Sequence, residues 1–150
     1  MRIAIASDHA ALALKAALVE HLRGGGHDVD DLGPFDDSSV DYPDDGYKRG
    51  DAIASGKVER GVALCGSGIG ISIAVNRNPA ARAALVSEPL SAKLAREHND
   101  ANVIAMGARL IGIEMAKACV DAFLSTDFGG DRHQRRVDKL SNPSTTKEPA

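Results

Sequence analysis

Tryptophan is absent from this sequence, and aromatic residues make up only 3% of its 150 residues. General nucleic-acid binders combine basic patches with aromatic stacking platforms, whereas this chain has a formal net charge of -3. It also lacks any apolar stretch near the roughly 20 residues that span a bilayer. These absences argue against a nucleic-acid partner and against a membrane partner. The expected partner is a small molecule or another protein subunit.

Cysteine is scarce as well, with Cys65 and Cys119 the only two. They make no disulfide framework, and the first residues, Met1-Arg2-Ile3-Ala4-Ile5, lack the length of a signal peptide, so we expect a reduced, cytoplasmic protein. The histidines show no HExxH pattern, and Cys65 has no cysteine or histidine at zinc-ligand spacing. We therefore expect neither a metal nor a cofactor.

Short apolar runs alternate with helical patterns along the chain. Expected strands cover 2–6, 27–32, 61–64, 82–86 and 102–106. Expected helices cover 11–22, 44–55, 88–97 and 131–140, with one more behind the strand 61–64 that reaches about residue 76 and another after Arg109 that contains residues 115–124. The charged run 27–32 suits the edge of a sheet. This alternation indicates one α/β domain over residues 1–140, a three-layer Rossmann-like arrangement with a parallel sheet. Residues 141–150 are expected to form a flexible tail.

Local patterns add detail to two of these helices. Ser87 is a favourable N-cap for the helix 88–97, in which Leu90 and Leu94 share a face. The expected helix after Arg109 carries an apolar stripe that consists of Met115, Cys119, Val120, Phe123 and Leu124. We interpret Cys119, on this stripe, as a packing residue.

The segment Cys65-Gly66-Ser67-Gly68-Ile69-Gly70 joins an expected strand to an expected helix. Three glycines in five positions indicate a tight turn whose backbone N–H groups point at whatever lies above the helix. Such groups suit an anion, or an oxygen that becomes negative during a reaction. A cysteine at this place has either a core role or, as a stabilised thiolate, the role of a base or nucleophile.

The same turn begins a G-x-G-x-x-G pattern, with Glu88 about 20 residues on, where a ribose-binding acid would lie. The match is partial, because Ile71 occupies the third glycine position and the turn follows the third strand instead of the first. It is not a P-loop either, because no lysine precedes Ser67. A non-catalytic nucleotide-binding module remains an alternative function.

Several polar residues follow the expected strands. Asp8-His9, the turn 65–70, Glu88 and Arg109 should converge at the edge of the sheet where ligands bind. Asp8 and His9 could instead cap the first helix, and His98 could likewise be a C-cap. Arg132 and Arg136, four residues apart, share a helical face that is either solvated or a clamp for a phosphate.

Taken together, five segments in this order resemble the type B ribose-5-phosphate isomerases, whose wider family includes galactose-6-phosphate and allose-6-phosphate isomerases. The resemblance runs from about residue 2 to residue 140. The segments are Ser7-Asp8-His9, Asp41-Tyr42-Pro43, Cys65-Gly66-Ser67-Gly68-Ile69-Gly70-Ile71-Ser72, His98-Asn99-Asp100-Ala101-Asn102 and Arg132-His133-Gln134-Arg135-Arg136.

The resemblance implies five parallel strands between helices, and a homodimer, or a dimer of dimers, whose active sites take residues from both subunits. It also implies metal-free isomerisation of ribose 5-phosphate and ribulose 5-phosphate through an enediolate, a reaction of pentose-phosphate metabolism. Cys65 matches the base that moves a proton between C2 and C1, with Ser67 beside the thiol. The matching cradle for the enediolate oxygen consists of the N–H groups of Gly66, Ser67, Gly68, Ile69 and Gly70.

The remaining positions match residues that handle the sugar and its phosphate. His98 matches the residue that assists opening of the furanose ring, Asp8 and Asn99 lie near sugar hydroxyls, and Tyr42 forms part of the pocket wall. The phosphate-binding positions are His9, Arg109, Arg132 and Arg136.

Two positions separate this chain from some relatives. One branch of the family uses a glutamate where Ile71 stands here, so this chain is expected to depend on Cys65. Asp131 stands where relatives more often have an arginine, and it places a negative charge beside the expected clamp. An isomerase of tetrose or hexose phosphates is a further alternative, because sequence does not show pocket length.

Overall fold

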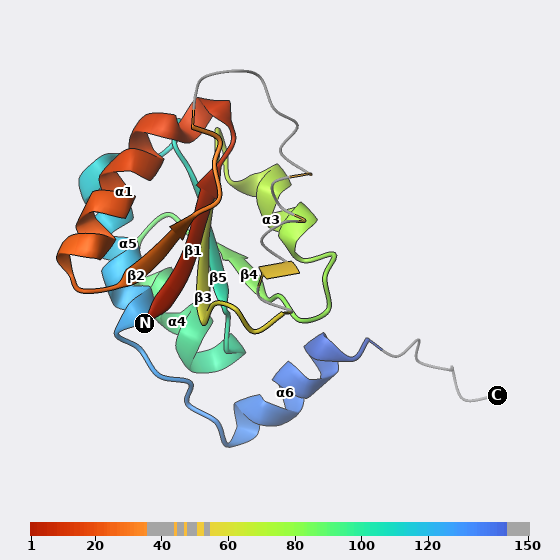
Figure 1. The fold of residues 1–150 in the computed structure, drawn as a ribbon. Coiled ribbons are helices and arrows are strands. Elements are labelled where there is room, and N and C mark those ends of the chain that lie inside the picture. The colour runs from red at the N-terminus through yellow and green to blue at the C-terminus, as the bar shows by residue number, and fades with distance from the viewer. Residues whose placement is uncertain (36–43, 45–46, 48–50, 53–54, 144–150) are drawn as a thin grey trace.

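The computed structural model describes residues 1–35, 44, 47, 51–52 and 55–143. Five strands form one sheet in the order β2-β1-β3-β5-β4, and each neighbouring pair is parallel. The predicted Rossmann-like α/β fold is confirmed (Figure 1). The elements are β1 (Arg2–Ser7), η1 (His9–Ala11), α1 (Leu12–Gly24), β2 (Asp28–Asp31), β3 (Arg60–Cys65), α3 (Ile69–Val75), β4 (Ala83–Leu85), α4 (Pro89–Asn99), β5 (Val103–Gly107), α5 (Ile113–Leu124) and α6 (Arg132–Ser141).

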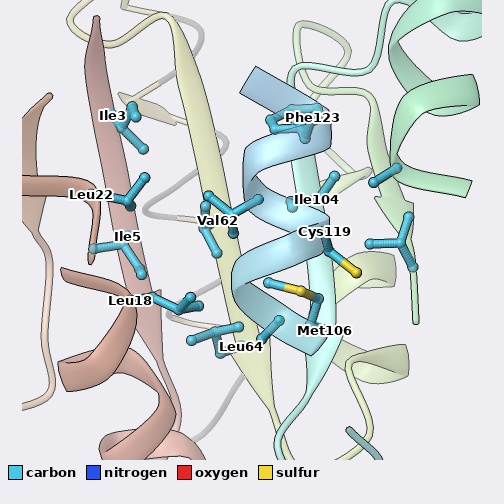
Figure 2. Packing of buried hydrophobic residues seen from close by; sticks show 14 of the residues in the cluster. Ile3, Ile5, Leu18, Leu22, Val62, Leu64, Ile104, Met106, Cys119 and Phe123 are labelled. Atoms are coloured by element: carbon cyan, nitrogen blue, oxygen red, sulfur yellow. The ribbon is translucent and has the colours of Figure 1, made fainter. Parts of the chain in front are cut away.

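The two faces of the sheet carry side chains of different size. Large residues of β1, β3 and β5 face α1, α4 and α5, and Figure 2 shows Val62, Ile104 and Phe123 in this core. On the other face the strands present small residues, such as Ala63 and Ala105, to α3. Because consecutive strand residues alternate between faces, this pattern places Cys65 on the α3 side.

The order of the strands reverses between β1 and β3. From β1 the chain moves to β2 on one side, and it then returns to β3 on the other side of β1. In open parallel sheets, ligands bind outside the carboxyl ends of the strands at such a switch point. We call the edge of the sheet where the strands end the carboxyl edge, and the edge where they begin the amino edge.

β2 lies at the edge of the sheet, as the sequence pattern predicts, and the structure places β4 at the other edge. Three of the four residues of β2 are aspartates. Such a strand suits the edge because its charges keep access to water, and Asp30 pairs with Arg2 of β1 at 3.1 Å.

The predicted apolar stripe of α5 is partly wrong. Cys119, Val120 and Phe123 are buried as expected, but Met115 is 42% exposed. Ala116 takes the buried position in the first turn, and one residue along a helix turns the side chain by about 100°. In α4, similarly, Leu90 is 61% exposed, and the helix buries Ala92, Ala95 and Arg96.

The predicted N-cap of α4 is also wrong, because Glu88 caps this helix in place of Ser87. The Glu88 carboxylate accepts hydrogen bonds from Leu90 N at 2.6 Å and from Ser91 N at 2.8 Å. An N-cap side chain reaches the second and third N–H groups of its helix, and the helix starts at Pro89, which has no N–H. The residue next to Pro89 is therefore the one that caps.

Two predicted segments lie largely outside the described residues. They are the helix 44–55 and most of the tail 141–150. Within the described part, Ser141 belongs to α6, so this helix continues one residue beyond its predicted end.

Candidate active site

The turn after β3 holds the thiol of Cys65 against backbone N–H groups. Cys65 is 5% exposed, and the N–H of Gly68 donates to its Sγ at 3.0 Å. This contact aims a backbone N–H at the sulfur and fixes the place of the thiol in the turn. Ser67 stands beside the thiol in the chain, and its Oγ accepts from Ile69 N at 3.2 Å.

Two glycines let the turn cross the end of β5. Gly68 has a φ of +79°, and a Cβ added there would lie 2.7 Å from both Leu85 Cδ1 and the Met106 carbonyl carbon. A Cβ added to Gly107 would lie 2.5 Å from the backbone carbonyl oxygen of Ser67. The turn and the end of β5 therefore interlock, and this fixes the position of the N–H groups around Cys65.

Free N–H groups remain in this turn. Ile69, Gly70 and Ile71 form the first turn of α3, where N–H groups have no intrahelical acceptor. Ile69 is bonded to Ser67, which leaves the other two available. Within the described part of the chain, the N–H of Gly66 makes no hydrogen bond either.

Arg109 brings a positive charge to the same turn. Its N–H donates to Gly66 O at 2.9 Å, and its side chain lies across Gly66, with Cδ 3.4 Å from the position of an added Cβ. Arg109 itself is exposed. A guanidinium over a turn with free N–H groups makes this region attractive to an anion.

Asp8 lies next to the turn, at the end of β1. Its N–H donates to Leu64 O at 3.0 Å, and the residue is 8% exposed. One carboxylate oxygen caps η1 by accepting from Ala10 N at 2.9 Å, so the predicted capping role is confirmed. His9 follows within η1 and is exposed. Asp8 and Cys65 thus stand at the switch point between β1 and β3.

Four other predicted site residues lie at the amino edge, away from Cys65. The helix α4 starts after β4 and runs back along the sheet (Figure 1). His98 and Asn99 are in its last turn and therefore lie where β5 begins. The length of β5, about 13 Å at about 3.3 Å per residue, separates them from Cys65. Arg132 and Arg136 are on α6, which packs against α4.

The other residues singled out from the sequence lie on α3, at the start of α6, or outside the described residues. Ile69 is 51% exposed on α3, whereas Ile71 is fully buried beneath the turn. Asp131 is the N-cap residue of α6, and its side chain makes no capping hydrogen bond. Tyr42 lies outside the described residues.

The sequence motifs include His133 without assigning it a role, and the structure places its ring on that of His98. The ring centroids are 4.5 Å apart. Burial, together with the positive charges of His98, Arg132 and Arg136, lowers the pKa of His133. The sequence could not predict this contact, because helical spacing relates residues of one helix and these two histidines belong to different helices.

Glu88 was the acid expected to bind a ribose if the turn held a dinucleotide. Both of its carboxylate oxygens cap α4, and bonds from the Ser91 side chain and backbone and from Leu90 N hold the pKa of Glu88 below its usual value. Its position is that of a helix cap, which leaves the dinucleotide alternative without its acidic residue.

The described residues lack the features of two other kinds of site. No group of three or more His, Cys, Asp or Glu side chains that could hold a metal occurs among them. In the same part of the chain, no helix is both long enough and apolar enough to cross a membrane.

Comparison with known proteins decides the family. The family model for ribose/galactose isomerases matches residues 3–140. The chain belongs to this family. It is 44% identical over 140 residues to ribose-5-phosphate isomerase B of Escherichia coli, a match that covers 93% of this chain and 94% of the relative.

Other members of the ribose/galactose isomerase family agree with this placement. The structure of ribose-5-phosphate isomerase B from Clostridium thermocellum superposes with a TM-score of 0.92 at 44% identity, over 94% of this chain and 95% of that one. D-Erythrulose-4-phosphate isomerase of Pectobacterium atrosepticum is 40% identical over 142 residues, covering 93% of each chain. The protein is therefore an aldose-ketose isomerase of sugar phosphates.

Proposed function

We propose that the protein interconverts ribose 5-phosphate and ribulose 5-phosphate without a metal, with Cys65 as the base. The observation that carries this proposal is the place of Cys65. Its Sγ lies at the switch point of the sheet and accepts the Gly68 N–H at 3.0 Å. This is the position where an open α/β sheet binds its ligand, and a backbone N–H points at the sulfur there.

The isomerisation needs one base and one oxyanion site. The Cys65 thiolate removes the proton from C2 of the open-chain aldose, and the electron pair moves so that the carbonyl oxygen on C1 becomes the enediolate oxygen. The turn 66–70 supplies N–H groups to that oxygen, with Arg109 nearby. A proton passes from the hydroxyl on C2 to the oxygen on C1, and Cys65 then returns its proton to C1 as the oxygen on C2 becomes the ketose carbonyl.

Opening of the furanose precedes this step. It moves a proton from the O1 hydroxyl to the ring oxygen as the bond between C1 and that oxygen breaks. We assign this proton transfer to His98, and contacts with the sugar hydroxyls to Asp8 and Asn99. Tyr42 is assigned to the pocket wall. The phosphate is assigned to His9, Arg109, Arg132 and Arg136.

This assignment requires two copies of the chain. Within one chain the length of β5 separates His98 and Asn99 from Cys65, so a partner must bring its amino edge to the carboxyl edge of the first. A homodimer with shared sites meets that need, and it can pair further into a dimer of dimers. Exposed apolar residues suited to an interface surround the carboxyl edge, namely Ile69, Ile73, Leu85, Leu90, Leu110, Ile113 and Met115.

The main alternative to this proposal is a substrate with a different number of carbon atoms. One is named for ribose 5-phosphate, with five carbons, and another for D-erythrulose 4-phosphate, with four. Asp131 places a negative charge beside the proposed phosphate-binding arginines of α6, where relatives more often have an arginine, so we propose it as a position that affects phosphate placement. Tetrose and hexose phosphates are therefore the second class of substrate to test.

The test is an activity panel of four-, five- and six-carbon sugar phosphates with a chelator present. We expect highest turnover with ribose 5-phosphate, unaffected by the chelator. Cys65→Ala should abolish turnover while calorimetry still shows binding of the sugar phosphate. Cys119→Ala, which removes the other thiol from the core, is the matched control and should remain active.

Three outcomes would contradict the proposal. A fully active Cys65→Ala protein excludes the thiol as base, and loss of activity in chelator excludes a metal-free reaction. Saturable binding of a dinucleotide without any isomerase activity would favour the nucleotide-binding module.

A further inference from the structure

The amino edge carries a pair of stacked imidazole rings. His98 in the last turn of α4 and His133 in the first turn of α6 have ring centroids 4.5 Å apart, and their planes differ by 14°. Both residues are half-buried. A ring that lies flat against another loses freedom to rotate about χ2, so each imidazole limits the orientations of the other.

The backbone around the stack ties the two helices together. Before α6, the N–H of Gly129 donates to Glu97 O at 2.9 Å. At the far end of α6, Arg82 donates to Ser141 Oγ at 3.3 Å and also to Asp100 O at 2.9 Å. Both ends of α6 are thus attached to the C-terminus of α4.

A buried arginine completes this frame. Arg96 is 3% exposed and donates to Asp100 Oδ1 at 2.7 Å and to Thr126 O at 3.3 Å. Asp100 ends α4 in the left-handed conformation, with φ 47°, and its second carboxylate oxygen binds Arg82 at 3.2 Å. These charge-assisted hydrogen bonds fix the C-terminus of α4 relative to α6. The two stacked rings therefore lie at a rigid contact between these helices.

The charges around the pair make its two rings unequal. Arg132 and Arg136 face His133 from its own helix, and His98 and Glu97 face it from α4. Partial burial and the three cations lower the pKa of His133, and Glu97 opposes them. His133 therefore stays neutral at pH values where an ordinary histidine begins to take up a proton.

We propose that His133 is a positioning residue for His98, which holds the plane of the His98 ring and takes no proton during turnover. This inference rests on the proposed function, in which His98 transfers the proton that opens the sugar ring. Stacking sets the direction in which the ring nitrogens of His98 point. A neutral neighbour avoids the repulsion that a second imidazolium would exert on a protonated His98.

Two variants of His133 separate positioning from proton transfer. His133→Ala removes the stacked ring and should lower kcat about tenfold with little change in KM, because His98 then samples unproductive orientations. His133→Phe keeps an aromatic ring without a titratable group and should restore kcat to within about threefold of the wild type. Gln134→Ala, at the exposed neighbouring position on α6, is the control and should not change kcat.

The pH profile gives a second readout. In the wild type, His133 becomes charged only at a pH below the ordinary histidine value of 6.5. His133→Phe cannot acquire that charge, so its kcat/KM profile should match that of the wild type above pH 6.5 and differ from it on the acid side. Identical acid limbs in the two proteins would overturn the electrostatic part of the inference.

A third readout does not depend on activity. The His98 ring protons should show an upfield ring-current shift in the NMR spectra of the wild type and His133→Phe, and lose it in His133→Ala. Unchanged kcat in His133→Ala, equal losses in both variants, or an absent ring-current shift would each overturn the inference. A wild type without activity on any sugar phosphate overturns the proposed function as well, whereas an active wild type restricts the failure to His133.

Discussion

At the scale of single residues, the candidate site depends on Gly68, a position where the backbone conformation and close neighbours exclude any side chain. Gly68 combines a positive φ with contacts on two sides, since an added Cβ would lie 2.7 Å from Leu85 and from Met106. Its N–H also donates to the Cys65 thiol. A side chain at Gly68 would therefore disturb the fold and the proposed base together.

We expect Gly68→Ala to lower the free energy of unfolding by about 2 to 4 kcal/mol, through backbone strain and overpacking. Urea denaturation measures the change. Gly24→Ala is the control, because an added Cβ there has no neighbour within 4 Å and lies at the end of α1. The control should be neutral or gain about 0.5 kcal/mol. Equal stability of the two variants would show that the turn relaxes around a Cβ.

Arg136 gives a second prediction at this scale. If its guanidinium binds the substrate phosphate, Arg136→Ala should raise KM by about ten- to a hundredfold, the equivalent of an interaction of about 1.5 to 3 kcal/mol. Initial rates with ribose 5-phosphate measure this effect. Arg135→Ala removes the neighbouring charge on α6 and should leave KM near the wild-type value. An unchanged KM in Arg136→Ala would exclude this residue from the phosphate site.

At the scale of elements, α4 connects the two edges of the sheet. It starts at the carboxyl edge, where Glu88 caps its first turn, and it ends at the amino edge, where Asp100 binds Arg82 and Arg96. Each end is held by a carboxylate with hydrogen bonds. The placement of His98 in its last turn therefore follows from how the whole helix is anchored.

The Glu88 cap predicts a pH dependence of stability. Hydrogen bonds from the Ser91 side chain and backbone, and from Leu90 N, lower the pKa of Glu88 from its usual 4.5. A carboxylate whose pKa is lower in the folded state stabilises that state above its unfolded pKa, and this contribution is lost as pH falls through the folded value. Wild type should thus be more stable than Glu88→Gln at pH 7.

Thermal unfolding of both proteins from neutral pH to below 4.5 checks this prediction. The stability difference between wild type and Glu88→Gln should be constant above the usual glutamate pKa and should shrink below it. A stability difference between the two proteins that does not vary with pH would contradict this prediction. It would show that the charge of Glu88 contributes nothing to the cap.

At the scale of the whole molecule, the proposed residues are divided between opposite edges of one sheet. Cys65, Asp8 and Arg109 lie at the carboxyl edge, while His98 and Arg136, on α4 and α6, lie at the amino edge. No rotation of side chains spans the length of β5. Catalysis by all of these residues in one site therefore requires the edge of a second subunit.

Mixing two inactive variants tests this arrangement. In a mixed dimer of Cys65→Ala and His98→Asn, one site combines the intact Cys65 of one subunit with the intact His98 of the other. After subunit exchange, half of the dimers are mixed and each has one complete site, so activity should recover to about a quarter of the wild-type level. Recovery should be absent before exchange. Absent activity in mixed dimers isolated by two different tags would contradict the shared site.

Some features of this protein are settled by the sequence alone. Alternating apolar runs and helical periods are local patterns, so the five strands, the turn 65–70 and the edge position of β2 could be predicted. The glycines of that turn and the cysteine before them also reveal a candidate base, because their backbone requirements arise within a few residues. The segments quoted from residue 7 to residue 136 indicated the family, and the match over residues 3–140 confirms it.

Other features depend on contacts between residues far apart in the sequence, and only the tertiary structure decided them. The order of the strands places Asp8 beside Cys65, and the return path of α4 takes His98 to the opposite edge. The packing of α6 on α4 stacks His133 on His98. Periodicity describes one element at a time, so it carries no information on which edge, face or neighbouring helix a side chain meets.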